Sequence, residues 1–271
     1  MKIRLAVCTL ATSLALPALA APVLETFNYV RFYGASDPRV SYACEQAVQA
    51  CRGSVAVPDT NWTAHYDAHG SSDFGILKNY AAVSLTGDAG GGAFPSFLSV
   101  GSRSGFIDEY TFTGDQGAGT AHFKFSIDGT AMSNDGAIGS SLMQYVPVRD
   151  GVLDWDGQRN FSTARGTAVV EVPIVFGTPV EMLISFYALA QVYQWQEGAA
   201  AVADFSHTAI LSGIEVRNGA GELVEGFSIA SASGTRYGPD GVIPEPGTGA
   251  LLLAGIGAAA WQRRLRRRSG A

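Results

Sequence analysis

The stretch HFKFSID (His122–Asp128) alternates apolar and polar residues at every step. Phe123, Phe125 and Ile127 fall on one side of an extended chain, and the polar residues between them fall on the other. A period of two is typical of a β-strand with one buried face and one face in water. This stretch therefore predicts a half-buried strand.

Two further runs extend the same interpretation. AVVEVPIVFG (Ala168–Gly177) is almost continuously apolar, as in a strand covered on both faces, and Pro173 within it indicates a sheet edge or a bulge. VEMLISFYALAQVYQW (Val180–Trp195) follows after a Gly-Thr-Pro turn and predicts one long strand. Four of its residues share a face: Met182, Ile184, Phe186 and Ala188.

Glycine clusters separate such runs from about Asn79 to Gly234, and no alternation of strands with helices is apparent. ILSGIEVRNGAGELVEGFSI (Ile210–Ile229) predicts a hairpin that turns at Asn218–Gly221. Short strands with frequent glycine turns are typical of antiparallel folds. The sequence predicts a mainly β domain over residues 21–240, built as an antiparallel sandwich of jelly-roll-like type.

The charge of this domain is more negative than that of the whole chain. All 24 acidic residues lie between Glu25 and Glu245, whereas 7 of the 18 basic residues lie in the two terminal segments described below. Residues 21–246, which include Glu245, carry 11 basic and 24 acidic residues and so a net charge of −13, which repels nucleic acid and anionic headgroups. No nucleic-acid partner and no cofactor are expected, and a neutral glycan or divalent cations suit this surface better.

The first 20 residues are typical of a secretory signal peptide. Lys2 and Arg4 precede an apolar run over Leu5–Leu16, and Ala18-Leu19-Ala20 forms a cleavage site. We expect signal peptidase to cut between Ala20 and Ala21. Cys8 would be removed with this segment.

Cys44 and Cys51 are then the only cysteines of the exported chain, and an oxidising compartment favours a disulfide between them. The surrounding residues, Asp37–Gly53, also have the pattern of a helix. In an unbroken helix, residues seven apart lie about 10.5 Å apart along the axis, beyond the roughly 7 Å that a disulfide spans. We expect a disulfide-closed loop that contains a short helix, and separate thiols on an unbroken helix are the alternative.

The C-terminal segment VIPEPGTGALLLAGIGAAAWQRRLRRRSGA (Val242–Ala271) has three parts. Pro244-Glu245-Pro246 comes first, and the apolar run Gly247–Trp261 follows. Five arginines end it: Arg263, Arg264, Arg266, Arg267 and Arg268. A helix of that apolar run is roughly 22 Å long, short of a hydrocarbon core about 30 Å thick. We expect a marginal single-pass helix whose arginines stay on the cytoplasmic side as a stop signal.

This order of Pro-Glu-Pro, apolar helix and arginine cluster resembles the PEP-CTERM sorting signal. The resemblance covers residues 242–271 and implies an exported protein of a Gram-negative bacterium that makes exopolysaccharide. It also implies processing near Pro244, Glu245 and Pro246 by an exosortase, a membrane cysteine peptidase. The protein would be anchored transiently by its C-terminal helix and would then reach the outer cell surface or the extracellular matrix. The resemblance assigns no activity to the rest of the chain.

Two groups of residues have spacings that invite a chemical interpretation. His65 and His69 stand four apart in HYDAH, but NWTAHYDAHGSSDFG is rich in turn residues, and we expect a solvated loop without a metal. Asp154 and Asp156 flank Trp155 in DWDG, where two carboxylates beside a sugar platform are the arrangement of a glycan hydrolase. Asp-x-Asp-Gly is also ordinary turn chemistry, which is the interpretation we favour.

Three classes of function follow from these observations. The expected class is a non-enzymatic protein of the cell surface or of a polysaccharide-rich matrix, with exopolysaccharide as a possible partner. A glycan-binding module is the alternative and needs an aromatic strip on one sheet face, for which Tyr187, Tyr193 and Trp195 are candidates. A hydrolase that uses Asp154 and Asp156 is the third. A concave aromatic face would favour binding, and converging buried carboxylates would favour hydrolysis.

Overall fold

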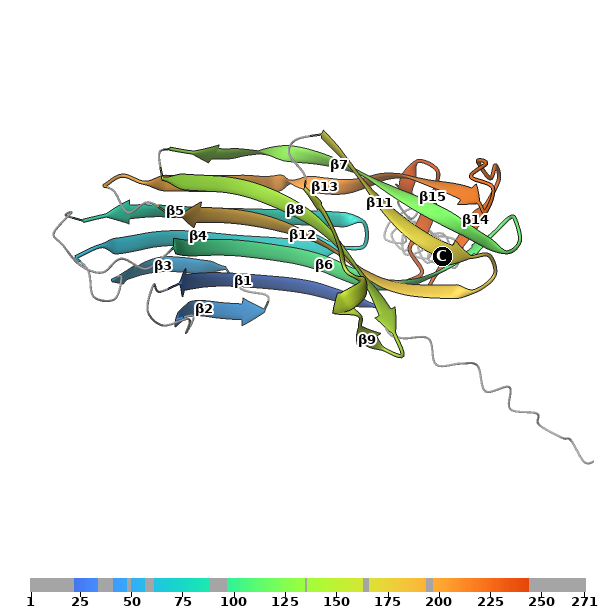
Figure 1. Ribbon diagram of the computed structural model, residues 1–271, viewed down its shortest axis with the longest axis horizontal. Helices are drawn as coiled ribbons and strands as arrows, with labels where there is room; N and C mark the ends of the chain where they lie inside the picture. The colour runs from blue at the N-terminus through green and yellow to red at the C-terminus, as the bar shows by residue number, and fades with distance from the viewer. Residues whose placement is uncertain are drawn as a thin grey trace, which may run out of the picture.

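The computed structural model confirms the mainly β prediction, because strands make up most of the chain it describes (Figure 1). Among the described residues, the only helical element is the short 3₁₀ helix η1 (Trp155–Gly157). No helix there has the length and apolar character needed to cross a bilayer. The predicted signal peptide and C-terminal helix lie outside the described residues. The described residues are 22–33, 41–47, 50–56, 61–87, 97–134, 136–162, 166–193 and 197–243.

The first sheet is antiparallel and follows the order β10-β8-β12-β6-β1-β2, with β14 paired to β6 and β9 paired to β8. Its members are β1 (Val23–Tyr33), β2 (Ser41–Ala47), β6 (Phe97–Thr113), β8 (Ala137–Arg149), β9 (Val152–Leu153), β10 (Arg159–Ser162), β12 (Pro179–Val192) and β14 (Ser228–Ser231).

The second sheet is also antiparallel and follows the order β11-β7-β13-β5-β4-β3. Its members are β3 (Cys51–Ala56), β4 (Thr63–Asp73), β5 (Ile76–Thr86), β7 (Ala118–Ser133), β11 (Gly166–Val175) and β13 (Ala200–Asn218). A separate two-stranded ribbon ends the described chain, with β15 (Arg236–Gly238) paired to β16 (Gly241–Ile243).

The strand order is that of a jelly roll, which confirms the predicted sandwich type. From β5 to β13 the chain changes sheet at every step except between β8 and β10. The last two strands of this series then lie inside the two sheets, with β12 between β6 and β8 and β13 between β5 and β7. Two Greek keys wound together give this interleaving. The strands β1 to β4 extend both sheets beyond the eight-stranded core.

The core lies between the two sheets and is built by the alternation that the sequence predicts. Phe123, Phe125 and Ile127 of β7 are all buried in it, as are Met182, Ile184, Phe186 and Ala188 of β12. Rings from opposite sheets meet edge to face, as Phe186 and Phe205 do with centroids 5.3 Å apart. Such aromatic contacts between sheets hold the layers at a fixed spacing.

Strand β11 agrees with one prediction and departs from another. It is the edge strand of the second sheet, where Pro173 costs no ladder hydrogen bond, as expected. However, only one face of β11 is buried, and Val175 on the other face is half exposed. A continuous apolar run therefore does not by itself show that both faces of a strand are covered.

A cluster of polar side chains lies inside the sandwich and joins its two layers. Asn79 of β5 donates to Ser104 Oγ at 2.8 Å and to the Phe186 carbonyl oxygen at 2.7 Å, and it accepts from Ser102 Oγ at 2.9 Å. These three side chains are at most 1 % exposed. Because a buried polar group costs free energy unless it is paired, this cluster fixes how the two sheets sit on each other.

We expect Asn79→Ala to lower the free energy of unfolding by about 1–3 kcal/mol, since Ser102, Ser104 and a backbone carbonyl lose their partner. Chemical denaturation followed by fluorescence measures the change. Asn61→Ala, at an exposed position, is the matched control. Equal stability of the two variants would contradict a structural role for the buried cluster.

A second buried polar group fastens the end of the described chain to the core. Asp108 of β6 is 1 % exposed and accepts from the Ser233 amide at 2.9 Å and from Ser233 Oγ at 2.6 Å. It also accepts from the Tyr237 hydroxyl at 3.3 Å and from the Glu109 amide at 3.0 Å. Tyr110 in turn contacts Tyr237, with hydroxyls 3.4 Å apart. We call these residues the Asp108 clasp.

Three local predictions were wrong. Where Asp37–Gly53 has the pattern of a helix, the described backbone forms β2, paired to β1, and the start of β3. The turn-rich Thr63–Asp73 forms β4, which pairs with neighbours on both sides. In both places sheet pairing outweighs intrinsic propensity, which is a weak local preference.

The third error concerns the hairpin predicted over Ile210–Ile229. The turn forms as expected, and Asn218 Oδ1 accepts from the amides of Ala220 and Glu222. The returning chain pairs with β13 only briefly and then crosses to β6 as β14. The turn chemistry was therefore correct, but the partner of the returning strand was not.

Cys51 is buried and disulfide-bonded. The side chain of its predicted partner, Cys44, lies outside the described residues. The Cys44–Cys51 bridge therefore stays a prediction.

Candidate functional site

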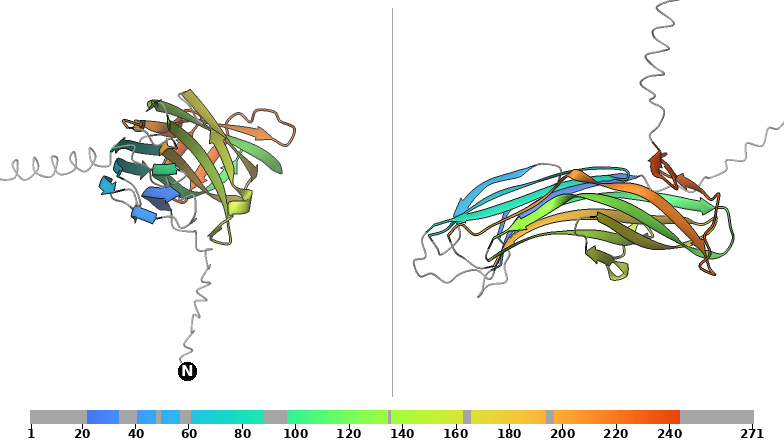
Figure 2. Two further views of the ribbon diagram at one scale, coloured as in Figure 1. Left: turned by 60° about the vertical axis from the view of Figure 1, so that its left-hand side comes forward. Right: turned by 90° about the horizontal axis from the view of Figure 1, so that it is seen from above.

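The two sheets are bent along their strands, and this gives the sandwich a hollow side. Figure 2 (right) shows the bend, with the small excursion of β9 and η1 on its hollow side. Because β9 pairs with β8, the hollow side is the outer face of the first sheet. We call it the hollow face.

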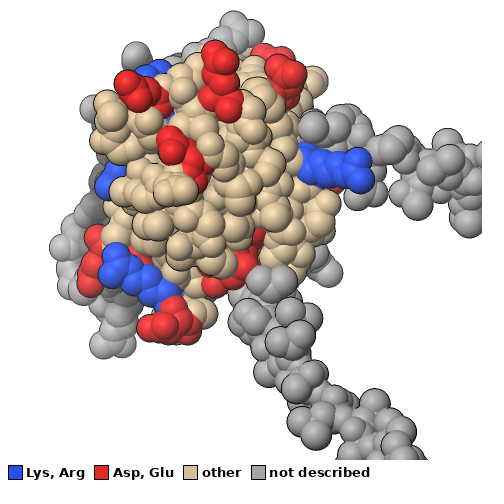
Figure 3. Space-filling model, turned by 90° about the vertical axis from the view of Figure 1, so that its right-hand side faces the viewer, with Lys and Arg blue, Asp and Glu red and all other residues tan. Residues whose placement is uncertain are grey.

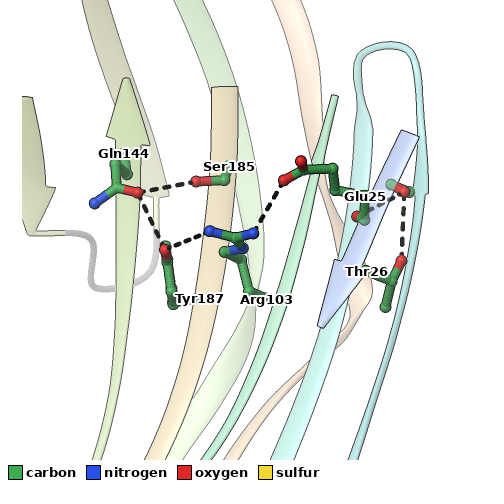
Figure 4. A network of polar contacts seen from close by, with 7 residues as sticks. Glu25, Thr26, Arg103, Gln144, Ser185 and Tyr187 are labelled. Carbon is green, nitrogen blue, oxygen red and sulfur yellow. Dashed lines mark hydrogen bonds and ion pairs between the residues drawn. The ribbon is translucent and has the colours of Figure 1, made fainter. Parts of the chain in front are cut away.

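Side chains from four neighbouring strands form a hydrogen-bonded cluster on the hollow face (Figure 4). Arg103 of β6 pairs with Glu25 of β1, with Nη2 and Oε2 3.0 Å apart. Its Nη1 donates to the Tyr187 hydroxyl at 3.3 Å, and that hydroxyl donates to Gln144 Oε1 at 3.1 Å. Phe27 completes the set, which we call the hollow-face cluster: Glu25, Phe27, Arg103, Gln144 and Tyr187.

The register of the strands puts these residues together. Phe27 and Tyr187 are the Cα partners of Arg103 on either side of β6. The guanidinium carbon of Arg103 lies 5.9 Å from each of these two rings. An arginine between two aromatic rings is held by cation–π attraction and by its ion pair together.

Two glycines of β6 make room beside Arg103. A Cβ atom at Gly101 would come within 2.4 Å of the Tyr29 ring. The Tyr29 ring therefore packs directly on the backbone of β6 at this glycine. A Cβ atom at Gly105 would meet Leu183 and Ser185 at 3.0 Å. The space that side chains at these two positions would take is thus filled by Tyr29 on one side of the arginine and by Leu183 and Ser185 on the other.

Amide groups continue the cluster toward the edge of the sheet. Gln144 accepts from Ser185 Oγ at 3.4 Å and donates through Nε2 to Asn160 Oδ1 at 3.0 Å. Gln158 Nε2 donates to the same oxygen at 3.2 Å. Each amide orients the next, so the polar groups of the hollow face are held in position before any ligand arrives.

A pair of carboxylates lies farther along the same face. Glu109 of β6 and Glu181 of β12 are directly opposite each other. Burial, and then the nearby charge of Glu109, raise the pKa of Glu181. Like charges at such a position destabilise the ionised pair.

Among the predicted aromatic candidates, Tyr187 takes part in the hollow-face cluster. Tyr193 directly follows the end of β12, is 45 % exposed, and donates weakly to the Ala137 carbonyl at 3.5 Å. Trp195 lies outside the described residues. The sequence did not single out Arg103, Glu25, Phe27 or Gln144, although the spacing of Gly101 and Gly105 around Arg103 is a signal that could have drawn attention to it.

The aspartates proposed for hydrolysis have structural partners. Asp154 caps η1 by accepting from the Gly157 amide at 3.2 Å, and it pairs with Arg149 Nε at 2.9 Å. Asp156 is exposed on η1 and Trp155 is 49 % exposed. The DWDG stretch is a capped turn, as the turn interpretation predicts.

The two histidines lie far apart along β4 on the outer face of the second sheet. Four residues of a strand span about 13 Å, and each ring has its own contacts. His65 lies 2.6 Å from Ser54 Oγ and 3.0 Å from Thr86 Oγ1, whereas His69 stacks on Tyr80. Among the described residues, no group of three or more His, Cys, Asp or Glu side chains is placed to hold a metal ion.

The predicted processing residues lie outside the described structure. Ala20 and Ala21, the motif Pro244, Glu245 and Pro246, and the arginines from Arg263 to Arg268 are not among the described residues. The last described strand, β16, ends at Ile243, directly before Pro244. The sorting segment therefore begins where the described fold ends.

Comparison with known proteins identifies this segment. A family model of the PEP-CTERM protein-sorting motif matches residues 242–268. A search of curated proteins gave no match for the chain. The matched segment of the chain is short. It specifies where the protein is sorted and assigns no activity to the rest of the chain. The chain therefore carries a PEP-CTERM protein-sorting motif at its C-terminal end, which supports an exported protein sorted through an exosortase.

Proposed function

We propose that the protein is a non-enzymatic component of the cell surface or extracellular matrix, delivered there by its sorting signal. In this proposal signal peptidase removes residues 1–20, and the C-terminal helix holds the domain at the inner membrane until an exosortase acts. Exopolysaccharide of the producing Gram-negative cell is the surrounding material.

The observation that carries this proposal is the junction between the fold and the signal. The motif match begins at Val242 within β16, and Tyr237 of the preceding strand is fastened to the core by the Asp108 clasp. The sorting motif therefore follows directly after the folded sandwich, without a long linker between them. A cut near Pro-Glu-Pro would release the sandwich whole.

The sequence of the signal supports a temporary anchor. Its apolar run is shorter than a bilayer core, and arginines oppose its passage across the membrane. Proline on both sides of Glu245 favours an extended backbone outside the bilayer. A peptidase can bind an extended segment, and Glu245 is the one charge within the motif that it can read.

We expect Glu245→Ala, or deletion of residues 263–268, to change the destination of the protein while leaving the sandwich folded. The measurement is its distribution among inner membrane, cell surface and medium, in cells with and without the exosortase. Glu225→Ala, an exposed carboxylate of the domain, is the matched control.

If neither the variants nor loss of the exosortase alters the distribution, the tail is an ordinary anchor and the sorting proposal is wrong. Folding is checked separately by circular dichroism of the purified variants, which should keep the β-sheet spectrum of the unaltered protein.

A further inference from the structure

We propose that the hollow-face cluster binds a neutral polysaccharide chain laid across the strands of the first sheet. This goes beyond the sorting function, because a sorted surface protein requires no ligand site. The site comprises Glu25, Phe27, Arg103, Gln144 and Tyr187, with the amides of Asn160 and Gln158 as its continuation.

The arrangement of apolar and polar groups suits a sugar chain. Pyranose rings have apolar C–H faces and a rim of hydroxyls, so proteins bind them with aromatic rings and fixed polar groups side by side. Here Phe27 and Tyr187 flank the guanidinium of Arg103, and the Tyr187 hydroxyl is held between Arg103 and Gln144. The polar groups are fixed by one another, which limits the entropy lost on binding.

The cluster also retains unused capacity for hydrogen bonds. Arg103 Nε has no hydrogen-bond partner among the described residues, but this atom is buried, so a ligand on the surface would first meet the exposed amide of Asn160. Gln144 and Asn160 carry amides that both donate and accept, as sugar hydroxyls do. A hydroxyl-rich ligand matches this mixture of donors and acceptors.

The balance of charge selects a neutral chain. The Arg103 guanidinium is neutralised by Glu25, with a separation of 3.0 Å, so the cluster offers no free positive charge to an anionic sugar. The domain is strongly acidic, and acidic side chains outnumber basic ones on the end of the sandwich shown in Figure 3. Polyanions such as polyuronates are repelled by such a surface.

The size of the cluster fits a segment of a chain rather than a single sugar. It crosses β1, β6, β12 and β8, which are three steps of a sheet. At about 4.8 Å a step, this is roughly 14 Å, before the amides beyond β8 are included. The bend of the sheet allows a chain to contact several strands at once (Figure 2).

The test measures binding of the full-length protein, purified in a mild detergent, to immobilised hexasaccharides. The neutral probes are cellohexaose, laminarihexaose and maltohexaose, and the anionic probe is hexagalacturonate. We expect binding to at least one neutral probe and not to the anionic one. Phe27→Ala and Tyr187→Ala should each weaken that binding by about tenfold or more, the equivalent of one lost stacking contact.

Tyr80→Ala is the matched control, because Tyr80 is a partly buried tyrosine that stacks on His69 on the opposite face. It should bind as the unaltered protein does. Tyr187→Phe keeps the ring and removes only the hydroxyl, so it tests the site even if an alanine variant folds poorly. We expect it to weaken binding by a smaller factor than Tyr187→Ala.

Failure to bind any neutral probe, preference for hexagalacturonate, or equal binding by Tyr80→Ala and Tyr187→Ala would each overturn the proposal. None of these results bears on sorting, which is measured by location in the cell. The two proposals therefore stand or fall separately.

Discussion

Asp108→Ala should lower the free energy of unfolding by about 3–5 kcal/mol, because it leaves several buried donors without an acceptor. The amides of Glu109 and Ser233 and the hydroxyls of Ser233 and Tyr237 all lose the same carboxylate. Burial raises the pKa of Tyr237 and of Tyr110, so both hydroxyls keep their protons and still need acceptors. Chemical denaturation measures the loss, and Asp156→Ala at an exposed position is the control, with a change within about 0.5 kcal/mol.

The same carboxylate should give the protein a characteristic dependence on pH. Burial raises the pKa of Asp108, and hydrogen bonds led by that from Ser233 offset part of this rise. With its pKa raised on folding, the folded state holds the proton more tightly than the unfolded state does. The contribution of Asp108 to stability is therefore greatest in acid and falls as pH rises from the unfolded pKa to the folded one.

Asp108→Asn removes this titration. Across that window, the stability of the unaltered protein relative to the Asp108→Asn variant should decrease with rising pH and then level off. Denaturation midpoints at a series of pH values provide the comparison. An increase with pH would mean that the hydrogen bonds outweigh burial and that the folded pKa is lowered.

Phe186→Ala should lower the free energy of unfolding by about 3–5 kcal/mol, the usual cost of removing a fully buried ring. Phe186 is completely buried at the centre of β12 and packs edge to face on Phe205 of the opposite sheet. Because β12 lies between β6 and β8, the surrounding strands have little freedom to close the cavity. Thermal or chemical denaturation measures the loss.

Tyr193→Ala is the control for that experiment, since its ring is 45 % exposed just beyond the same strand, and its cost should stay below about 1 kcal/mol. Phe186→Leu should cost less than Phe186→Ala because it fills most of the same space. Equal losses for Phe186→Ala and Tyr193→Ala would show that the contact between the sheets contributes little.

The fold class could be predicted from the sequence because alternation reports burial directly. Phe123, Phe125 and Ile127 lie inward as their spacing predicts, and Pro173 marks an edge strand because it cannot donate to a ladder. Local pattern could not predict which strand lies beside which. The return of the chain after Asn218 to β6, rather than to β13, depends on packing at long range.

The hollow-face cluster was largely invisible for a related reason. Glu25 and Arg103 are 78 positions apart in the chain, and Arg103 and Tyr187 are 84 apart. Each is an ordinary polar or aromatic residue on the outer side of its own strand. They form a site only through the register of three pairings, which no single stretch of sequence specifies. Tyr187 was the exception because its strand has a clear alternation.

The order in which the strands interleave has a consequence for the timing of export. β12 and β13 come late in the chain, yet they lie in the interior of the two sheets. A chain that leaves the membrane with its N-terminus first cannot complete the strand order of the first sheet until Val192 has emerged, or that of the second sheet until Asn218 has emerged. Until then its strands lack their partners, and loop closure over such distances is slow. The topology therefore delays folding, so the polypeptide stays unfolded while most of it is translocated. The sandwich can fold completely only when little more than the sorting signal remains on the other side of the membrane.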